Sequence, residues 1–275
     1  MAGINQESLY NFIYRLLDVG GALKTIINSV MHRNLYTSLK RNNELKVRIE
    51  KSPKAYVCAL GPSLKQVKLE EIKGDTIVVN RFFKIGMEHP SFVPTYYIMI
   101  DAGFTSEEHI KDFKKALDTY LPKGTIFLLN SKLSGSPILE EYDKQNIYFV
   151  SCFRGNTNVK KKYGLDKPMP AFQNVACAAI FFLIQMGYKE ISLLGCDFNS
   201  FASRKRIHCY KEEKTDERFL SMAWELFCYS MMARNHDDLQ KYAVSKGVRV
   251  VNSTEGSLID SYPYIIEEGL YTTIK

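Results

Sequence analysis

The stretch of this sequence with the most chemical potential is Ser203–Tyr210, where cations stand beside a histidine and a tyrosine. In order along the chain these residues are Arg204, Lys205, Arg206, His208 and Tyr210. Guanidinium and ammonium groups bind phosphate oxygens, and a histidine can take a proton from a hydroxyl near neutral pH. The run therefore suits a site that holds a diphosphate or a departing phosphate while His208 acts as a base. A solvated basic loop is the commoner explanation of such a run.

A second candidate is the turn Gly61-Pro62-Ser63, which ends an apolar run. Glycine lets backbone amides approach a phosphate or ribose, and Ser63 can cap a following helix. The turn is not a GxGxxG motif, and the sequence has no GxxxxGK(S/T) loop and no DxD carboxylate pair. NAD binding, P-loop chemistry and a DxD-type sugar transferase therefore lose support. The adjacent Asp237-Asp238 falls in a helical stretch and is expected on its solvated surface.

Short apolar runs alternating with helical segments position these residues. The runs expected as strands are 55–60, 76–80, 96–101, 125–129, 147–150, 190–195 and 248–252, and the clearest helices are expected over 174–186 and roughly 216–246. Continuous apolar strands that alternate with helices are typical of a parallel sheet covered on both faces. The sequence thus predicts one doubly wound α/β domain over residues 55–275.

Polar and small residues follow most of these expected strands. They are Gly61-Pro62-Ser63, Asn80, Asp101, Arg154-Gly155-Asn156, Gly195 to Asn199, and Asn252 to Gly256. In doubly wound sheets, ligands bind beyond the carboxyl ends of the strands. Gly, Asn and Asp also favour turns for local reasons. Their recurrence after six strands nevertheless favours a ligand cleft at this edge.

The N-terminal fifth of the chain has a separate character. Residues 1–54 hold nine Lys or Arg against four Asp or Glu, and this surplus of five supplies most of the net charge of +7. Apolar residues recur at helical spacing from Ser8 to about Leu39, with a break expected at Gly20-Gly21. The stripe fits packing on the core or on another subunit, and it also fits contact with an anionic lipid surface. Residues 41–54 are polar, and we expect a linker there.

Composition limits the classes of protein that fit. The 275 residues, 45% of them hydrophobic, suffice for a substantial core. The six cysteines include no CxxC pair, and no histidine has zinc-like spacing to them, so free thiols in a reducing compartment are expected. No segment resembles a signal peptide, and the longest apolar run, 175–184, is half of a membrane span. We expect a cytoplasmic protein, peripheral on the inner face of the membrane and able to form homo-oligomers, with no nucleic-acid partner.

Several segments together resemble a known group of proteins. They are Ala59 to Lys65 with Gly-Pro-Ser at its centre, Asn80, Met186 to Ile191, and Gly195-Cys196-Asp197-Phe198. These segments resemble bacterial sialyltransferases of the Campylobacter type, which are inverting, use CMP-sialic acid and lack a DxD motif. With Asn252 to Gly256 added, they also resemble the related motility accessory factor and 6-hydroxymethylpterin diphosphokinase-like proteins. The resemblance covers about residues 55–265 and implies a Rossmann-like fold of the GT-A-variant type.

The resemblance implies roles for individual residues. His208 matches the position of the catalytic base of the sialyltransferases, and the Gly61-Pro62-Ser63 turn and Asn80 match positions that hold the cytidine nucleotide. The rim residues Asp101, Gly195 and Asp197 are expected beside the nucleotide, and Gln173, Asn174, Arg204, Arg206 and Tyr210 beside the donor sugar or phosphate. The implied activity is transfer of a CMP-activated sugar (sialic acid-like, another nonulosonate or Kdo) to a glycan or lipid-linked acceptor in surface glycan synthesis. No metal site and no required cofactor are expected, although Mg²⁺ could stimulate.

Two departures from the sialyltransferase pattern weaken sialic acid as the specific donor. Ala59-Leu60 replaces the usual Gly-Asn before Gly-Pro-Ser, and Pro170 to Asn174 replaces an Arg followed by Thr-Ser-Gly. Two other functions stay open. One is an ATP-dependent pyrophosphokinase, which would need Mg²⁺ held by Asp101 and Asp197. The other is a nucleotide-binding protein without catalytic activity.

Overall fold

A single parallel sheet organises the part of the chain that the computed structural model describes. The described residues are 37–49, 54–101, 107–153, 162–203, 207–210 and 221–272, together with Phe12, Leu16 and Val19. The seven strands of the sheet are β1 (Lys54–Cys58), β2 (Asp75–Val79), β3 (Tyr96–Met99), β4 (Ile126–Asn130), β5 (Ile147–Val150), β8 (Glu190–Leu194) and β9 (Arg249–Asn252). All neighbouring pairs are parallel. This confirms the predicted fold class, and each predicted strand is present with ends shifted by at most two residues.

The order of the strands creates a switch point in the middle of the sheet. The order is β5-β4-β3-β2-β1-β8-β9, so the chain builds outwards from β1 in one direction and then returns to β1 to continue in the other. The last residue of β1, Cys58, pairs with Val78 of β2 and with Leu194 of β8. These three strands therefore end level with one another. Ligands of doubly wound sheets bind at such a point.

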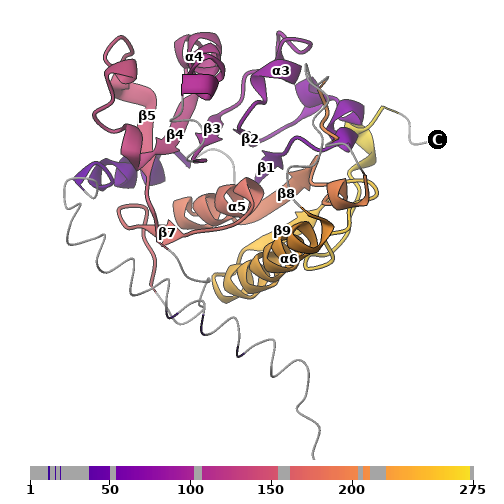
Figure 1. Cartoon of the computed structure of the whole chain (residues 1–275). Helices are drawn as coiled ribbons and strands as arrows, with labels where there is room; N and C mark the ends of the chain where they lie inside the picture. The colour runs from indigo at the N-terminus through magenta and orange to yellow at the C-terminus, as the bar shows by residue number, and fades with distance from the viewer. Residues whose placement is uncertain are drawn as a thin grey trace, which may run out of the picture.

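Helices cover both faces of the sheet (Figure 1). They are α3 (Phe83–Gly86), α4 (Glu107–Tyr120), α5 (Val175–Met186) and α6 (Met222–Ser245). Along β1, Ala55 and Val57 pack with α5 and α6, whereas Tyr56 and Cys58 pack with α3 and α4. This alternation of side chains along a strand produces two separate cores. The helix predicted over 174–186 is confirmed, and the described part of the one predicted over 216–246 begins at Met222.

Short elements complete the described structure. They are the 3₁₀ helices η1 (Lys40–Ile49), η2 (Pro62–Gln66), η3 (Leu69–Glu71), η5 (Leu121–Lys123), η6 (Ser131–Leu133), η7 (Pro137–Leu139), η8 (Lys144–Asn146), η9 (Ser200–Ala202) and η10 (Glu268–Leu270), and the two-residue strands β6 (Cys152–Phe153) and β7 (Met169–Pro170). None of the helices in the described ranges combines the length and apolarity that a membrane crossing requires.

The linker predicted over 41–54 is wrong for the segment that forms η1. Asn42 is buried and donates through Nδ2 to the carbonyl oxygens of Phe149, at 2.7 Å, and Leu165, at 2.9 Å. Arg41 donates to the carbonyl oxygen of Lys144 at 2.6 Å, and Leu45 is fully buried in the core on the α5 side of the sheet, where η1 contacts α5 and β5. Polar side chains that bond to backbone carbonyls can dock a segment as firmly as apolar ones, which composition does not reveal.

Most of the predicted N-terminal helical stripe lies outside the described residues. At the three positions that are described, Phe12, Leu16 and Val19, the backbone is helical and the side chains are 57%, 57% and 67% exposed. At these positions the stripe does not pack on the core of the same chain.

Glu267 ties the C-terminal segment to the amino ends of β1 and β8. Its Oε2 accepts from Lys54 Nζ and from the Tyr56 hydroxyl, both at 2.9 Å, and its Oε1 accepts from Ser192 Oγ at 2.7 Å. Burial would raise the pKa of Glu267, but the hydrogen bonds from Lys54, Ser192 and Tyr56 outweigh it and lower the pKa. The carboxylate is therefore charged, and its hydrogen bonds link the C-terminal segment to the sheet at the end opposite the switch point.

We expect Glu267→Gln to lower the free energy of unfolding by about 2 kcal/mol, because the charge that pairs with partly buried Lys54 is removed. Urea denaturation measures the change. Glu268→Gln is the matched control, since Glu268 is exposed at the start of η10. Equal midpoints for the two variants would contradict a stabilising role of Glu267.

Candidate functional site

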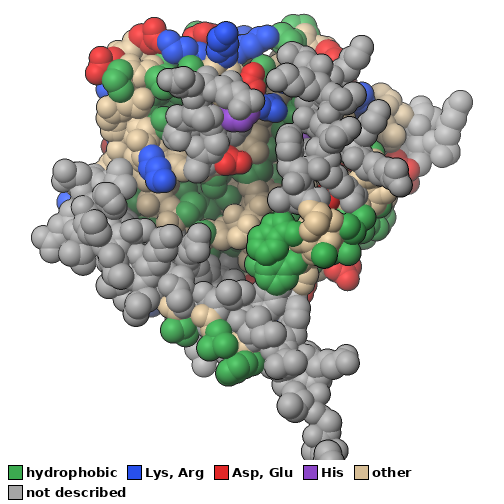
Figure 2. All heavy atoms as spheres, in the orientation of Figure 1, with side chains coloured by type: hydrophobic (Ala, Val, Ile, Leu, Met, Phe, Trp, Pro, Cys, Tyr) green, Lys and Arg blue, Asp and Glu red, His purple; other side chains and the backbone are tan. Residues whose placement is uncertain are grey.

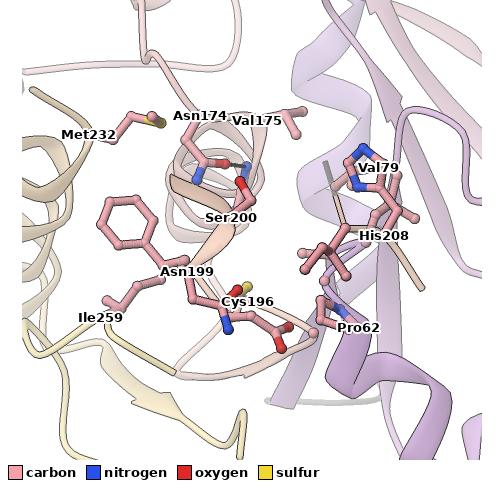
Figure 3. Close-up of a pocket in the computed structure, with 18 of the residues that line it drawn as sticks. Pro62, Val79, Asn174, Val175, Cys196, Asn199, Ser200, His208, Met232 and Ile259 are labelled. Carbon is pink, nitrogen blue, oxygen red and sulfur yellow. Dashed lines mark hydrogen bonds between the residues drawn. The ribbon is translucent and has the colours of Figure 1, made fainter. Parts of the chain in front are cut away.

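A cavity of about 210 Å³ opens at the switch point, beyond the carboxyl ends of β1, β2 and β8. The residues that line it come from the end of β2, the loops after β1, β2, β8 and β9, the start of α5, the 207–210 segment and α6. They are Ala59, Leu60, Gly61, Pro62, Val79, Asn80, Asn174, Val175, Ala176, Gly195, Cys196, Asp197, Phe198, Asn199, Ser200, Ile207, His208, Tyr229, Met232 and Ile259. Figure 3 shows Pro62, Val79 and His208 on one side of the cavity, and Met232 and Ile259 on the other.

The Gly61-Pro62-Ser63 turn is held against the loop after β8. Gly61 donates its backbone N–H to the carbonyl of Gly195 at 2.8 Å. The carboxylate of Asp197 accepts from the Ser63 backbone N–H at 3.1 Å and from the Ser63 hydroxyl at 2.8 Å. A Cβ on Gly61 would lie 1.9 Å from Asp197 Oδ2 and 2.6 Å from the Gly195 carbonyl oxygen. Only glycine allows the two loops to approach this closely.

Asp197 therefore lines the cavity and also accepts hydrogen bonds that hold the Gly61-Pro62-Ser63 turn in place. Burial raises the pKa of Asp197, and the hydrogen bonds from Ser63 offset only part of that effect. Both carboxylate oxygens already have a partner. Asp197 is thus the residue that positions the turn.

Asn80 lines the cavity and carries a buried acceptor without a partner. It is one of two described non-glycine residues with positive φ, at 47°. The Tyr97 hydroxyl donates to its carbonyl oxygen at 2.7 Å and accepts from the Phe83 backbone N–H at 3.0 Å, which fixes the backbone after β2. The side-chain Oδ1 is buried and has no hydrogen-bond partner. A buried acceptor without a partner in a strained backbone is typical of a ligand-binding position.

His208 is held at the mouth of the cavity by its neighbours in sequence. Cys209 is buried and donates its backbone N–H to the carbonyl of Leu60 at 2.9 Å, which pins the segment beside the loop after β1. Tyr210 is also buried, and its ring stacks on that of His208 with centroids 5.1 Å apart. Lys84 lies over the Tyr210 ring, with Nζ 4.9 Å from the centroid. The imidazole therefore rests on a fixed aromatic surface.

The wall opposite His208 is apolar and is backed by a buried histidine. Phe198, with φ of 59°, packs against Tyr229 at 4.8 Å and edge-on against His236 at 5.8 Å between centroids. His236 is fully buried, and its ring nitrogens lie 3.4 Å from Cys177 Sγ and 3.1 Å from the Tyr262 hydroxyl. Burial lowers the pKa of His236 to about 4, so the ring is neutral near pH 7.

The structure brings together most of the residues singled out from the sequence. Gly61, Pro62, Asn80, Asn174, Gly195, Asp197 and His208 line the cavity. Four others, Ser63, Asp101, Gln173 and Tyr210, do not line it. Ser63 is buried behind the turn, Asp101 is exposed at the end of β3, and the backbone of Gln173 donates to Asn235 Oδ1 at 3.3 Å.

The other residues expected at the site are Tyr210, which the structure describes, and several that lie outside the described ranges. Tyr210, expected to contact the donor, is instead buried beneath His208 and does not line the cavity. Arg204 and Arg206, and the expected rim segment 154–156, lie outside the described residues. Asn252 and Thr254 are fully buried. The Thr254 hydroxyl accepts from the Cys196 backbone N–H in the loop after β8 at 3.0 Å, and Asn252 donates to the Ile259 carbonyl in its own loop at 3.0 Å, so this rim segment supports the site from behind.

Sequence reasoning missed the residues of the apolar wall that come from α6 and from the loop after β9. Tyr229, Met232 and Ile259 belong to no motif, and nothing in a single sequence distinguishes them from core residues. Ser200 was missed by one position, because the rim after β8 was expected to end at Asn199.

We expect Gly61→Ala to destabilise the protein by about 1–3 kcal/mol, because its Cβ has to displace the Asp197 carboxylate or a backbone carbonyl. Gly135→Ala is the matched control, since a Cβ there meets nothing within 4 Å and the backbone φ is not positive. Chemical denaturation of both variants measures the difference. A Gly61→Ala variant as stable as Gly135→Ala would show that the turn is not held closely.

We also expect His236 to make stability depend on pH. The unfolded ring titrates near pH 6.5 and the folded one near 4, so the unfolded state binds more protons between these values. Stability from this residue is complete above pH 6.5, and about 2 kcal/mol of it is lost when the pH falls from 7 to 5. Urea midpoints at the two pH values, for the wild type and His236→Gln, measure this. A drop of the same size in both proteins would assign it to other groups.

A family model matches the chain over residues 29–201, and its description is 6-hydroxymethylpterin diphosphokinase MptE-like. The match confirms the resemblance to that group which the sequence motifs indicated. No curated protein is a significant match.

Solved structures similar to the chain include two sialyltransferases of Campylobacter jejuni. CstII, determined in complex with the substrate analogue CMP-3FNeuAc, is 12% identical, with a TM-score of 0.47 over 80% of this chain and 89% of that one. The monofunctional alpha-2,3-sialyltransferase Cst-I is 11% identical, with a TM-score of 0.40 over 82% of this chain and 84% of that one. Similarity at this level gives no information about activity.

Proposed function

The chain belongs to the 6-hydroxymethylpterin diphosphokinase MptE-like family, and we propose that it is an inverting glycosyltransferase that uses a CMP-activated sugar. The observation that supports this most is the placement of His208 at the mouth of a cavity whose other polar elements suit a nucleotide. Of the motifs that resemble sialyltransferases, those that contain Gly61, Asn80 and Gly195 contribute residues to the lining of that cavity.

The nucleotide would occupy the side formed by the loops after β1 and β2. Here Gly61 and Pro62 line the cavity, and Asn80 carries an acceptor that lacks a donor in the protein. The cytosine amino group or a ribose hydroxyl would satisfy Asn80 Oδ1. The resemblance of these residues to cytidine-binding positions supports CMP as the nucleotide.

The phosphate would lie against the start of α5. Asn174, Val175 and Ala176 line the cavity, and Asn174 caps the helix by accepting from the Ala176 N–H at 2.8 Å. The amino end of a helix carries partial positive charge and stabilises phosphate groups. At this end Ala176 is buried, and Asn174 and Val175 are half-buried, which limits the screening of the helix charge by water.

In the proposed reaction, His208 removes the proton from the acceptor hydroxyl. The acceptor oxygen forms a bond to the anomeric carbon while the bond from that carbon to the phosphate oxygen breaks, and CMP leaves with the electron pair. The configuration at the anomeric carbon inverts. Stacking on Tyr210 holds the imidazole in one orientation, and the helix end stabilises the charge that develops on CMP.

The name of the family favours a second candidate, an ATP-dependent pyrophosphokinase, which would require Mg²⁺. The described residues do not fit that ion well. Asp197 is bound through both oxygens to Ser63, and Asp101 does not line the cavity. In the described ranges, no group of three His, Cys, Asp or Glu side chains is arranged to hold a metal. We therefore derive no step through Mg²⁺.

We propose further that the acceptor is a glycan precursor met at the inner surface of a bacterial membrane. The basic surplus of residues 1–54 and the exposed apolar side chains of Phe12 and Leu16 support this location. Attachment of such a segment would bring the cavity close to membrane-bound acceptors.

We expect CMP, without added metal, to raise the melting temperature of the wild type and of His208→Ala, because the histidine lies beside the nucleotide rather than beneath it. Transfer from CMP-N-acetylneuraminate or CMP-Kdo should fall by about a hundredfold or more in His208→Ala, the usual range for loss of a general base. Asn80→Ala should weaken the CMP response. Thermal shift and product analysis measure these effects.

Near-wild-type transfer by a folded His208→Ala variant would remove His208 from the mechanism. Stabilisation by ATP only with Mg²⁺, and none by CMP, would replace the proposed activity with pyrophosphokinase activity. No response to CMP, CDP, UDP, GDP or ATP would favour a protein without this catalytic function.

A further inference from the structure

The first half of α6 is apolar but not buried. Between Met222 and Ala233 the only polar side chains are Glu225 and Ser230, counting Tyr and Cys as apolar, yet no residue from 221 to 234 is buried. Met222 is 48% exposed and Leu226 is 45% exposed. By contrast, the apolar residues of α5 from Ala176 to Ile184 are all buried. Figure 2 shows hydrophobic side chains gathered on the surface over this part of α6. Such patches mark binding surfaces.

One side of this helix leads from the surface into the cavity. Met222, Leu226, Tyr229 and Met232 follow one another at intervals of four, three and three residues, so they form one stripe along the helix, here called the α6 stripe. Tyr229 and Met232 line the cavity, whereas Met222 and Leu226 lie on the exposed surface. The apolar wall opposite His208 therefore continues out of the site.

The two walls of the cavity differ in polarity. The wall with His208, Asn80 and the Gly61 turn is polar, whereas Phe198, Met232 and Ile259 form an apolar wall. A molecule that presents a hydroxyl to His208 and extends past Tyr229 must be polar at one end and apolar at the other.

We propose that the acceptor is an amphiphile, with a sugar hydroxyl at His208 and a hydrocarbon chain that lies along the α6 stripe. This inference rests on the proposed function and specifies its substrate class. A slender chain can follow a stripe that begins on the surface and ends inside a cavity, whereas a second copy of the protein or a bilayer is too broad to enter it. On the far side of the helix, Trp224 and Phe227 pack on each other, with ring centroids 5.4 Å apart.

The test uses methyl, butyl and octyl β-galactosides as acceptor probes. Binding to the CMP-loaded protein, measured by calorimetry, should tighten by about three- to fourfold for each methylene that reaches the α6 stripe. The double variant Met222→Ser with Leu226→Ser should lose most of this dependence on chain length while binding the methyl galactoside unchanged. Val244→Ser is the matched control, since Val244 is a 64% exposed apolar residue near the other end of α6.

Absence of a chain-length effect in the wild type, or its persistence in the double variant, would overturn the inference. If chain-length-dependent binding occurs but no CMP-sugar is transferred, the proposed reaction fails and the apolar binding surface stands.

Trp224, the chain's one tryptophan, is 52% exposed. Its fluorescence emission therefore detects whether a second copy of the chain or a bilayer covers α6. We expect its emission to be independent of protein concentration and of vesicles that lack an acceptor. A blue shift with rising protein concentration would assign the helix to a second copy of the chain, and a blue shift with anionic vesicles alone would assign it to a bilayer. Either result would overturn the proposal.

Discussion

The bond between Asp197 and Ser63 joins the two halves of the site. One partner follows β8 and the other follows β1, and these strands are neighbours only because the chain returns to the centre of the sheet. The bond brings the loops so close that residue 61 has no space for a side chain. The same loop pair then supplies the carbonyl of Leu60, to which the segment with His208 is attached. The position of the proposed base thus depends on a carboxylate that does not itself take part in the chemistry.

Polar groups around the cavity differ in whether the protein itself supplies their hydrogen-bond partners. Asp197, Thr254 and Asn252 all have protein partners, and they support the backbone of the rim. Asn80 Oδ1 lacks one, although Tyr97 fixes the backbone of the same residue. An acceptor held in place without a donor loses little conformational freedom when a ligand supplies one. This is the arrangement expected of a preorganised binding site.

The strands and the rim could be predicted from the sequence because they depend on local patterns. Runs such as Ile77 to Val79 are apolar throughout, and the residues that follow them are turn formers. The apolar wall could not be predicted, because Tyr229 and Met232 reach the site only through the docking of α6 against the sheet. The docking of η1 was missed for a related reason: Arg41 and Asn42 are polar, and their partners are backbone carbonyls more than 100 residues away. The burial of Tyr210 beneath His208 could not be predicted, because a sequence does not show which side of a loop is buried.

The order of the strands has a consequence for synthesis of the chain. β1 is made early and receives its second neighbour, β8, only after about 130 more residues, the separation of Ser63 and Asp197. Until then the edge of β1, with its apolar residues Ala55 to Cys58, has unpaired backbone groups that can pair with other chains. Parallel sheets with such distant neighbours fold slowly. The nascent protein is therefore expected to depend on chaperones, and low temperature during expression should favour soluble material over inclusion bodies.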